Sequence, residues 1–235
     1  MHALYYGPRH RMAFRVGTYL ALIRMMGIGH LVTSLYGHSR LLHETHARLA
    51  RTRQTLADLI CHGFDSPTGQ AALQRLCHAH RGVQATADDY RYVLGTFFLE
   101  PLRWNDGFGR QALSAEELDT LLSFWHRIGQ AMGIDALPTD LAGWRQLQQA
   151  YEAQHLRPTR EGRHLARLCL QEVVRLTVPF GTRWMFRAIM RSTMEARVRD
   201  TLGIEPARGL LRWIVRIGWS RGAQPRASRG AIAGS

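Results

Sequence analysis

The sequence predicts an all-α fold in a single multi-helix domain. Apolar residues recur at spacings of three and four through most of the chain, and no alternation with a period of two persists beyond a few residues. Helix-capping residues precede several of these stretches, and glycines follow them. With 235 residues, 46% of them hydrophobic and 21% charged, the composition is that of a globular protein. We expect one helical domain over residues 1–220 and a disordered C-terminal tail over residues 221–235.

The chain is strongly basic, and its charge is unevenly distributed. The net charge of +13 arises from 31 arginines against 18 acidic residues, with no lysine anywhere in the sequence. The excess of arginine lies in residues 1–54 and 175–235. The absence of lysine excludes Schiff-base and lysine general-base chemistry. Basic ends are typical of contact with nucleic acid or anionic lipid, and equally of a surface that serves solubility alone.

The cysteines indicate a reducing compartment. Cys61, Cys77 and Cys169 form no paired framework, so we expect a cytoplasmic protein whose contact with a membrane is peripheral. A zinc site made of Cys61, His62, Cys77 and His78 is not favoured, because their spacing matches no standard pattern of zinc ligands.

Two helical stretches are predicted before Gly63. Residues 12–36 are apolar but are interrupted by Arg15, Arg24, a histidine and three glycines. This is too interrupted for a membrane span, and it predicts a buried or membrane-surface helix. The next helix is predicted from about residue 41 to residue 62, with Gly63 at its C-terminal cap.

The following stretch places two histidines on different faces of one helix. Ser66 and Pro67 mark its start, with a capping hydroxyl followed by proline at the first helical position. His80 lies on the apolar face, and His78 is expected to face water. A buried imidazole needs a partner, either a backbone carbonyl or a metal, because an unpaired buried polar group is costly. The residues of the apolar face are Leu73, Leu76, His80 and Val83.

Further capped helices complete the predicted domain. Thr86 caps a helix over residues 87–104, which Asn105-Asp106-Gly107 is expected to break. Ser114 and Glu117 form a capping box for the next helix, which Gly133 ends. The remaining helical patterns cover residues 139–155, 159–177, 181–202 and 209–219.

Several common functional motifs are absent from the sequence. There is no phosphate loop, dinucleotide fingerprint, nucleophile elbow or zinc-protease helix, and no motif for covalent haem attachment. The residues alone therefore indicate a helical domain with one inward histidine and many arginines. A histidine of this kind is more often structural than a ligand.

A long stretch nevertheless resembles a known enzyme family. The segment from Arg51 to Trp104, followed by residues 114–138, resembles the core of the family of mpaB oxygenases and rubber oxygenases (latex-clearing proteins). The matching elements are an Arg-x-x-x-Thr helix, Gly-Phe-Asp-Ser, the histidine helix, Asp-Asp-Tyr with Tyr-Val-Leu, Pro-x-Arg-Trp, and Met-Gly-Ile before a proline. The resemblance covers about residues 41–160 well and both ends loosely. It implies a globin-like helical fold and, from the rubber-cleaving members, a b-type haem held by a histidine.

The resemblance implies which histidine holds the iron. The family's histidine falls on His80, the residue that the helical spacing also places inward. The family usually has asparagine three residues earlier, where this chain has Cys77. His78 is the fallback ligand.

The resemblance also implies roles for four further side chains. Arg48 and Thr52 lie one turn apart on one helical face, and with Arg51 they would contact bound dioxygen. Arg51 stands where rubber oxygenase has a lysine, and an arginine orients a ligand rather than binding iron. Arg48 and Arg103 are candidates to hold a haem propionate. The alternatives are solvated charges at Arg48 and Arg51, a local backbone bond at Thr52, and an ion pair of Arg103 with Glu100.

The predicted function is that of a haem b-dependent oxygenase. It would act with dioxygen on a small hydrophobic substrate, of which an isoprenoid is one candidate, by oxidative cleavage of a carbon–carbon double bond or by hydroxylation. One alternative is a non-catalytic basic helical protein that associates with anionic membranes through segments such as residues 209–219. Another is an arginine-rich nucleic-acid binder, which we do not expect because the sequence has no recognition-helix motif.

Overall fold

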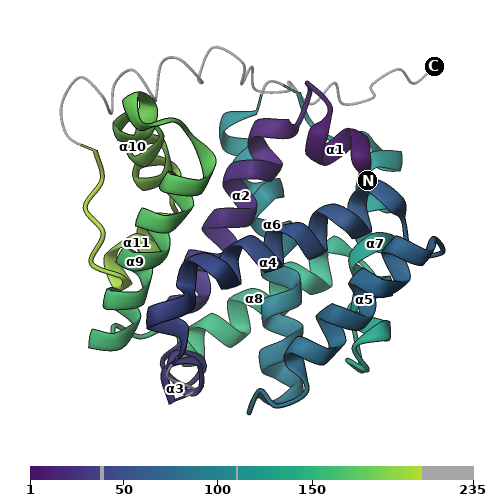
Figure 1. Cartoon of the computed structure of the whole chain (residues 1–235), viewed down its shortest axis with the longest axis horizontal. Coiled ribbons are helices and arrows are strands. Elements are labelled where there is room, and N and C mark those ends of the chain that lie inside the picture. Colours follow the sequence, from purple (N-terminus) through teal and green to yellow (C-terminus); the bar gives the residue numbers. More distant parts are fainter. Residues whose placement is uncertain (38–39, 110, 208–235) are drawn as a thin grey trace, which may run out of the picture.

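The computed structural model describes residues 1–37, 40–109 and 111–207, without the side chains of residues 34–46 and 48. All regular structure in these ranges is helical, and no strand occurs in them, which confirms the predicted all-α class (Figure 1). The helix predicted over residues 209–219 and the tail over residues 221–235 lie outside the described residues.

The N-terminal apolar stretch forms two helices where the sequence predicts one. The 3-10 turn Met25–Gly27 ends the first, and Ile28 adopts an extended conformation, with φ of −101° and ψ of 103°. Ile28 pairs there with Leu156 in an isolated antiparallel bridge, and the backbone N–H of Arg157 donates to the carbonyl of Gly27 over 3.0 Å. These contacts with a distant segment explain the break. The N-terminal helices are α1 (His2–Tyr6), α2 (Arg11–Arg24) and α3 (Gly29–Gly37).

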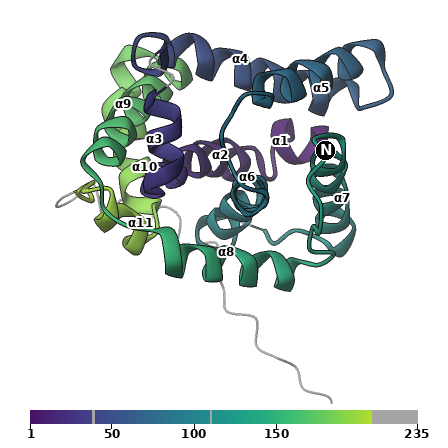
Figure 2. The ribbon, with the colours of Figure 1, turned by 90° about the horizontal axis from the view of Figure 1, so that it is seen from below.

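The predicted hairpin around Gly63 is confirmed. Helix α4 (Arg40–His62) ends at Gly63, whose φ of +70° is a left-handed conformation that favours glycine. Helix α5 (Pro67–His80) begins after Ser66, whose side chain accepts a hydrogen bond from the backbone N–H of Gly69 over 3.0 Å. The two helices pack against each other in one layer (Figure 2).

Helix α6 (Ala87–Phe108) runs through the centre of the molecule, with α4 and α5 on one side and α8 on the other (Figure 2). Its predicted end at Asn105 is wrong, because the helix continues to Phe108. Asn105 is buried, and its side chain donates to the carbonyl of Gln111 over 2.8 Å and faces His10 Nδ1 over 3.1 Å. These tertiary contacts hold the segment in helical form despite its turn-forming residues.

Helices α2 and α6 approach each other closely where they cross. A Cβ placed on Gly17 of α2 would lie 2.3 Å from the Cα of Pro101 in α6. Only glycine leaves room for this crossing. The crossing lies in a hydrophobic core that extends from Leu4 to Ile204.

The remaining helices begin within two residues of their predicted starts, with one interruption. The Ser114–Glu117 capping box is formed. The helix predicted over residues 181–202 is divided, because Met194 and Glu195 are extended and Glu195 accepts a hydrogen bond from Arg24 over 2.7 Å. No helix in the described ranges is long and apolar enough to cross a membrane. These elements are α7 (Ala115–Ala131), α8 (Leu141–His155), α9 (Arg160–Thr177), the 3-10 turn Phe180–Thr182, α10 (Arg183–Thr193) and α11 (Ala196–Thr201).

Candidate functional site

A cavity of about 270 Å³ lies between α1, α2, α4 and α6. Most of its wall is apolar, and no acidic side chain among the described residues lines it. Three arginines and three tyrosines add polar groups, so the cavity suits an apolar molecule that carries an anionic or polar end. The lining residues are Tyr5, Tyr6, Arg11, Phe14, Arg15, Thr18, Tyr19, Leu22, Leu49, Thr52, Arg53, Leu56, Ala57, Ile60 and Phe97.

Two of the arginines tie the cavity to the end of α9. Arg15 donates a hydrogen bond from Nη2 to the carbonyl of Thr177, and Arg53 donates from Nη1 to the carbonyl of Leu176 over 3.3 Å. Carbonyl groups in the last turn of a helix lack intrahelical partners and carry partial negative charge, which explains why the guanidinium groups lie there. The arginine side of the cavity is therefore next to the C-terminal end of α9.

Two hydroxyl groups of the cavity lining are buried without a partner. Among the described residues, neither the hydroxyl of Tyr5 nor that of Thr18 makes a hydrogen bond of ordinary geometry. Burial raises the pKa of Tyr5, although the polar groups of Thr18 and Trp125 nearby act to lower it. Buried polar atoms are usually paired with protein, water or ligand. The hydroxyls of Tyr5 and Thr18 are therefore buried polar groups beside the cavity whose hydrogen-bonding capacity is not fully satisfied.

His80 has the orientation of a histidine that can act as a ligand. Its side chain is half-buried, and Nδ1 lies 2.7 Å from the carbonyl oxygen of Leu76. Because a carbonyl only accepts hydrogen bonds, Nδ1 carries the proton and Nε2 keeps its lone pair. The ring lies edge-on to Tyr90 of α6, and Nε2 has no hydrogen-bond partner in the described structure. His78 is exposed, so the predicted faces of the two histidines are confirmed.

The described residues near His80 do not form a metal site with it. No group of three or more histidine, cysteine or acidic side chains within the described ranges could hold a metal ion. The thiol of Cys77 donates to the carbonyl of Ala131 over 3.4 Å, and all three cysteines are free. His80 does not line the 270 Å³ cavity. A group bound through His80 would therefore rest on a single protein ligand.

The structure separates the other predicted site residues. Thr52 lines the cavity, whereas the side chain of Arg51 is exposed and does not line it. The side chain of Arg48 lies outside the described part of the structure. Arg53, which sequence reasoning did not select, does line the cavity. Its spacing of four from Leu49 is the signal that could have identified it.

Arg103 forms the ion pair that the sequence offered as the alternative to a propionate contact. Its Nε donates to Glu100 Oε1 over 2.9 Å, and its Nη2 donates to Glu100 Oε2 over 2.7 Å. Both Nη atoms also lie 3.4 Å from the carbonyl oxygen of Thr193. The guanidinium is thus engaged on every nitrogen and does not line the cavity.

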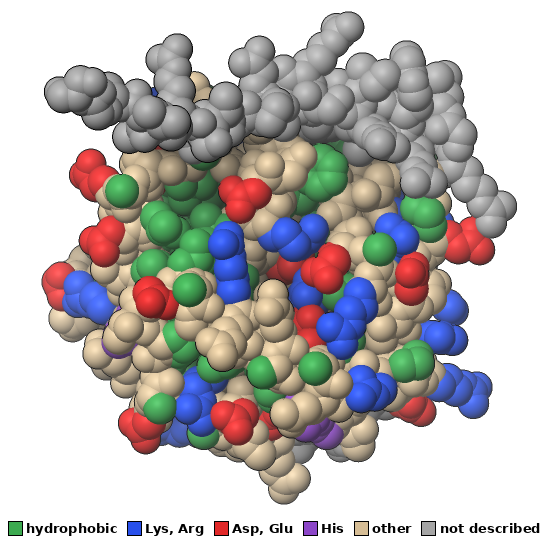
Figure 3. All heavy atoms as spheres, turned by 180° about the vertical axis from the view of Figure 1, so that it is seen from behind, with side chains coloured by type: hydrophobic (Ala, Val, Ile, Leu, Met, Phe, Trp, Pro, Cys, Tyr) green, Lys and Arg blue, Asp and Glu red, His purple; other side chains and the backbone are tan. Residues whose placement is uncertain are grey.

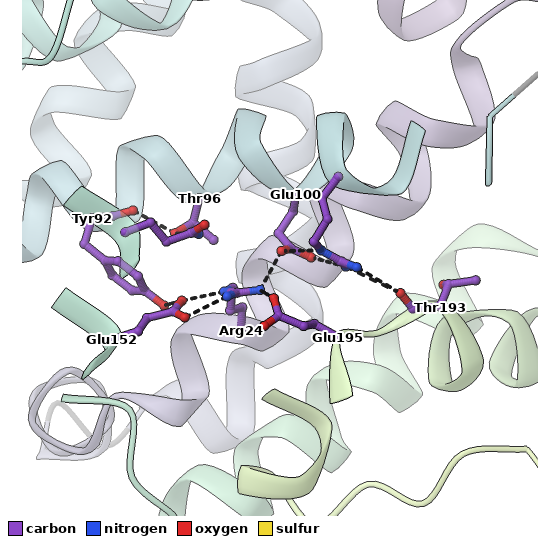
Figure 4. A network of polar contacts seen from close by, with 9 residues as sticks. Arg24, Tyr92, Thr96, Glu100, Glu152, Thr193 and Glu195 are labelled. Atoms are coloured by element: carbon purple, nitrogen blue, oxygen red, sulfur yellow. Dashed lines mark hydrogen bonds and ion pairs between the residues drawn. The ribbon is translucent and has the colours of Figure 1, made fainter. Parts of the chain in front are cut away.

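Glu100 belongs to a buried network centred on Arg24 (Figure 4). Arg24 also bonds Glu152 twice, over 2.5 and 2.7 Å, and Glu195 over 2.7 Å. Burial opposes the charge of Glu100, but Arg103 and Arg24 outweigh it and hold the pKa of this carboxyl below its ordinary value. Burial likewise opposes the charge of Arg24, and its three carboxylate partners nevertheless raise its pKa. The network joins α2, α6, α8 and the segment before α11.

A second polar cluster surrounds Asp89 at the start of α6. One carboxylate oxygen accepts from the backbone N–H of Thr86 over 2.7 Å and so completes a capping box. The other accepts from His30 Nε2 over 2.7 Å and from the hydroxyl of Tyr151. Burial alone would raise the pKa of Asp89, but the bonds from Tyr151, His30 and Thr86 lower it. Burial and the adjacent carboxylate raise the pKa of Tyr151.

The structure is thus a helical domain with a mostly apolar cavity whose wall also carries arginine and tyrosine side chains. The chain belongs to the family described as ER-bound oxygenase mpaB/B'/Rubber oxygenase, catalytic domain, which matches residues 7–221. The resemblance drawn from the sequence is thereby confirmed.

The relatives found are fungal oxygenases. The chain is 29% identical over 168 residues to "ER-bound oxygenase mpaB" of Penicillium brevicompactum, covering 62% of this chain and 42% of the relative. It is 29% identical over 168 residues to "ER-bound oxygenase mpaB'" of the same organism, covering 62% and 39%. It is 30% identical over 121 residues to "ER-bound oxygenase mpaB" of Penicillium roqueforti (strain FM164), covering 43% and 41%. The matches thus span about two fifths of the length of these relatives. No solved structure matches the chain.

Proposed function

We propose that this chain is an oxygenase, an oxidoreductase that transfers oxygen from dioxygen to a small hydrophobic substrate. The family match over residues 7–221 carries this proposal, because the relatives are named as oxygenases. The apolar cavity between α2, α4 and α6 supports it, since a hydrophobic substrate needs such a wall. An isoprenoid is one candidate, and the reaction is oxidative cleavage of a double bond or hydroxylation.

The proposed cofactor is haem b, for which the described part of the chain offers one donor, the unpaired Nε2 of His80, which lies outside the lining of the 270 Å³ cavity. His80 would hold the iron through Nε2, because Nδ1 is fixed by the carbonyl of Leu76. His78 remains the fallback. The haem would supply the chemistry of dioxygen activation. Arg11 and Arg53 line the cavity and are candidates to pair with the carboxylates of the haem propionates. Arg103 is already paired with Glu100.

The other residues of the chain would set polarity and access. Thr52 would donate a hydrogen bond from its hydroxyl into the cavity that it lines. Arg48, one helical turn earlier, and Arg51 would contribute positive charge near bound dioxygen. Phe14, Leu56 and the other apolar lining residues would exclude water and hold the substrate.

The absorption spectrum of the protein expressed with haem supplied tests this proposal. We expect a Soret band at near-stoichiometric haem, lost in His80→Ala and kept in the matched control His78→Ala. Loss in His78→Ala alone would assign the iron to His78. A wild-type protein without haem would overturn the cofactor assignment. Consumption of dioxygen with substrate in the absence of haem would indicate an oxygenase that does not depend on haem.

Peripheral membrane association is compatible with the enzyme and is proposed with it. The printed names of the relatives include "ER-bound", which describes those proteins. The specific observation in this chain is a set of exposed apolar side chains around α10. A wild-type chain that binds lipid vesicles but takes up no haem and consumes no oxygen would favour a non-catalytic membrane-binding protein.

A further inference from the structure

We propose that an exposed edge formed by Phe180, Trp184 and Met185, here termed the α10 edge, binds the surface of an anionic lipid membrane. Phe180 is 84% exposed, Trp184 61% and Met185 44%. Large aromatic side chains exposed together in this way mark interaction sites, whereas single exposed apolar residues are common. Five large hydrophobic residues are exposed in the described structure, and three of them lie within these six consecutive positions.

The helical spacing of α10 explains why the edge is exposed. Phe186, Ile189 and Met190 of this helix are buried, and they lie on the face that packs against α9. Trp184 precedes Phe186 by two residues, about half a turn, and therefore points away from the core, whereas Met185 lies at the border of the buried face and is 44% exposed. Phe180 lies in the 3-10 turn just before α10. The helix is thus anchored by one face and presents the other to its surroundings.

The charge around the edge favours anionic lipid as its partner. From residue 173 to residue 194 the sequence has no acidic residue and four arginines, of which Arg175 is paired with the preceding Glu172 over 3.1 Å. The guanidinium of Arg183 lies 5.5 Å from the centre of the Phe180 ring, which places a cation directly beside the apolar group. Figure 3 shows several arginine side chains on the right of the molecule, the side of α9 to α11, interspersed with a few acidic ones. The four arginines are Arg175, Arg183, Arg187 and Arg191.

Exposed apolar side chains beside arginines fit a lipid membrane better than a second copy of the chain as the partner of the α10 edge. A two-fold contact through the α10 edge would bring Arg183 and Arg187 against their own counterparts, and the sequence has no acidic residue between positions 173 and 194 to separate them. A lipid surface instead offers acyl chains to Phe180 and Trp184 and anionic headgroups to the arginines. Tryptophan and arginine side chains are both suited to the boundary between these two layers.

The α10 edge is close to the cavity. Arg15 and Arg53 line the cavity and bind the last carbonyls of α9, at Thr177 and Leu176. Phe180 follows Thr177 by three residues, a distance of at most about 10 Å along the chain. In Figure 1, helices α10 and α1 both lie along the upper side of the molecule, with α2 between them. A hydrophobic substrate dissolved in lipid would therefore be delivered beside the cavity. This delivery rests on the proposed function, whereas the binding of the α10 edge to lipid is independent of it.

Sedimentation of the full-length chain with lipid vesicles tests the proposal. We expect binding to vesicles that contain phosphatidylcholine and phosphatidylserine, little binding to phosphatidylcholine alone, and weaker binding as salt increases. The double variant Phe180→Ser with Trp184→Ser should lower the apparent affinity by about tenfold or more. Arg187→Gln should weaken binding more than the control Arg145→Gln, which removes an exposed arginine from α8.

A spectroscopic measurement locates the contact. Lipids brominated in their acyl chains should quench part of the tryptophan fluorescence, and Trp184→Phe should remove most of that quenching. Trp104, Trp125 and Trp144 are buried and should contribute little. Quenching that persists in Trp184→Phe would place the contact elsewhere, for example on residues 208–235, and would overturn the proposal.

Further outcomes of the vesicle assay also decide whether the α10 edge binds lipid. Vesicle binding that is unchanged in the double variant overturns the proposal. A double variant with altered thermal stability or oligomeric state but unchanged vesicle binding would assign the edge to a contact within the chain or with a second copy. The same assay on His80→Ala separates the two proposals, because lipid binding should survive the loss of haem.

Discussion

The guanidinium of Arg24 forms two parallel hydrogen bonds with the carboxylate of Glu152, over 2.5 and 2.7 Å, and both side chains are almost fully buried. Tyr92 adds a third bond to this carboxylate over 2.9 Å. A buried pair of charges persists only when its hydrogen-bonding capacity is satisfied, and here it connects α2 with α6 and α8. The network therefore holds α2 and α6, two of the helices that form the cavity, in register with each other.

Replacement of Arg24 should be strongly destabilising. Arg24→Met would leave Glu152 and Glu100 buried without their shared cation, and we expect a loss of about 3–5 kcal/mol in the free energy of unfolding. Urea denaturation measures this loss. The control Arg127→Met removes an exposed ion pair with Asp65 and should cost about 1 kcal/mol or less. Equal effects of the two substitutions would contradict the structural role of the network.

Stability should fall in acid because two carboxyl groups have lowered pKa values. Asp89 and Glu100 lie below their ordinary pKa values of 3.8 and 4.5 in the folded protein. Since the folded state binds these protons less readily than the unfolded chain, their contribution is complete above the ordinary values. It is lost as the pH falls through the folded values.

The melting temperature as a function of pH tests this contribution. Asp89→Asn should lower stability near pH 7, and its difference from the parent protein should shrink below about pH 4 as Asp89 itself becomes protonated. A difference that stays constant over the whole range would show that the charge of Asp89 has no role.

The crossing of α2 and α6 should not tolerate a side chain at position 17. Gly17→Ala would place a Cβ against the backbone of Pro101, and we expect a loss of about 3 kcal/mol, because neither backbone can move without disturbing the core. Thermal unfolding provides the measurement. Gly82→Ala, where an added Cβ meets nothing within 4 Å, is the matched control and should change stability little.

Two tyrosine substitutions should have opposite signs. The hydroxyl of Tyr92 donates to Glu152, so Tyr92→Phe should cost about 1–3 kcal/mol. The hydroxyl of Tyr5 is buried without a partner, so Tyr5→Phe should leave the ligand-free protein as stable as before or slightly more stable. Both are measured by chemical denaturation. Marked destabilisation by Tyr5→Phe would mean that the cavity hydroxyl is paired.

Local signals in the sequence were sufficient for most helix starts. Ser66, Thr86 and Ser114 each accept a hydrogen bond from a backbone N–H three residues later, so the pattern and the bond belong to the same short segment. The inward position of His80 also follows from spacing within one helix. These features were predictable because every atom involved is close along the chain.

Contacts between distant segments decided what the local signals missed. Asn105 stays helical because it bonds Gln111 and faces His10, and the chain bends at Glu195 where this residue meets Arg24. Arg103 shows both cases. Its ion pair with Glu100, three residues away, was expected from the sequence, whereas its contact with the carbonyl of Thr193 was not. Helix propensity alone does not predict such exceptions, since tertiary contacts outweigh it.

The sequence by itself determined the all-α class, the positions of the main caps, the family and the inward histidine. Only the tertiary structure decided which side chains line the cavity, since Tyr5, Arg53 and Phe97 come from three segments far apart in the chain. It also decided that Phe180 and Trp184 remain exposed while Phe186 is buried. Hydrogen bonds and periodicity within a helix are encoded over a few residues, whereas a cavity and a surface exist only after the helices have packed.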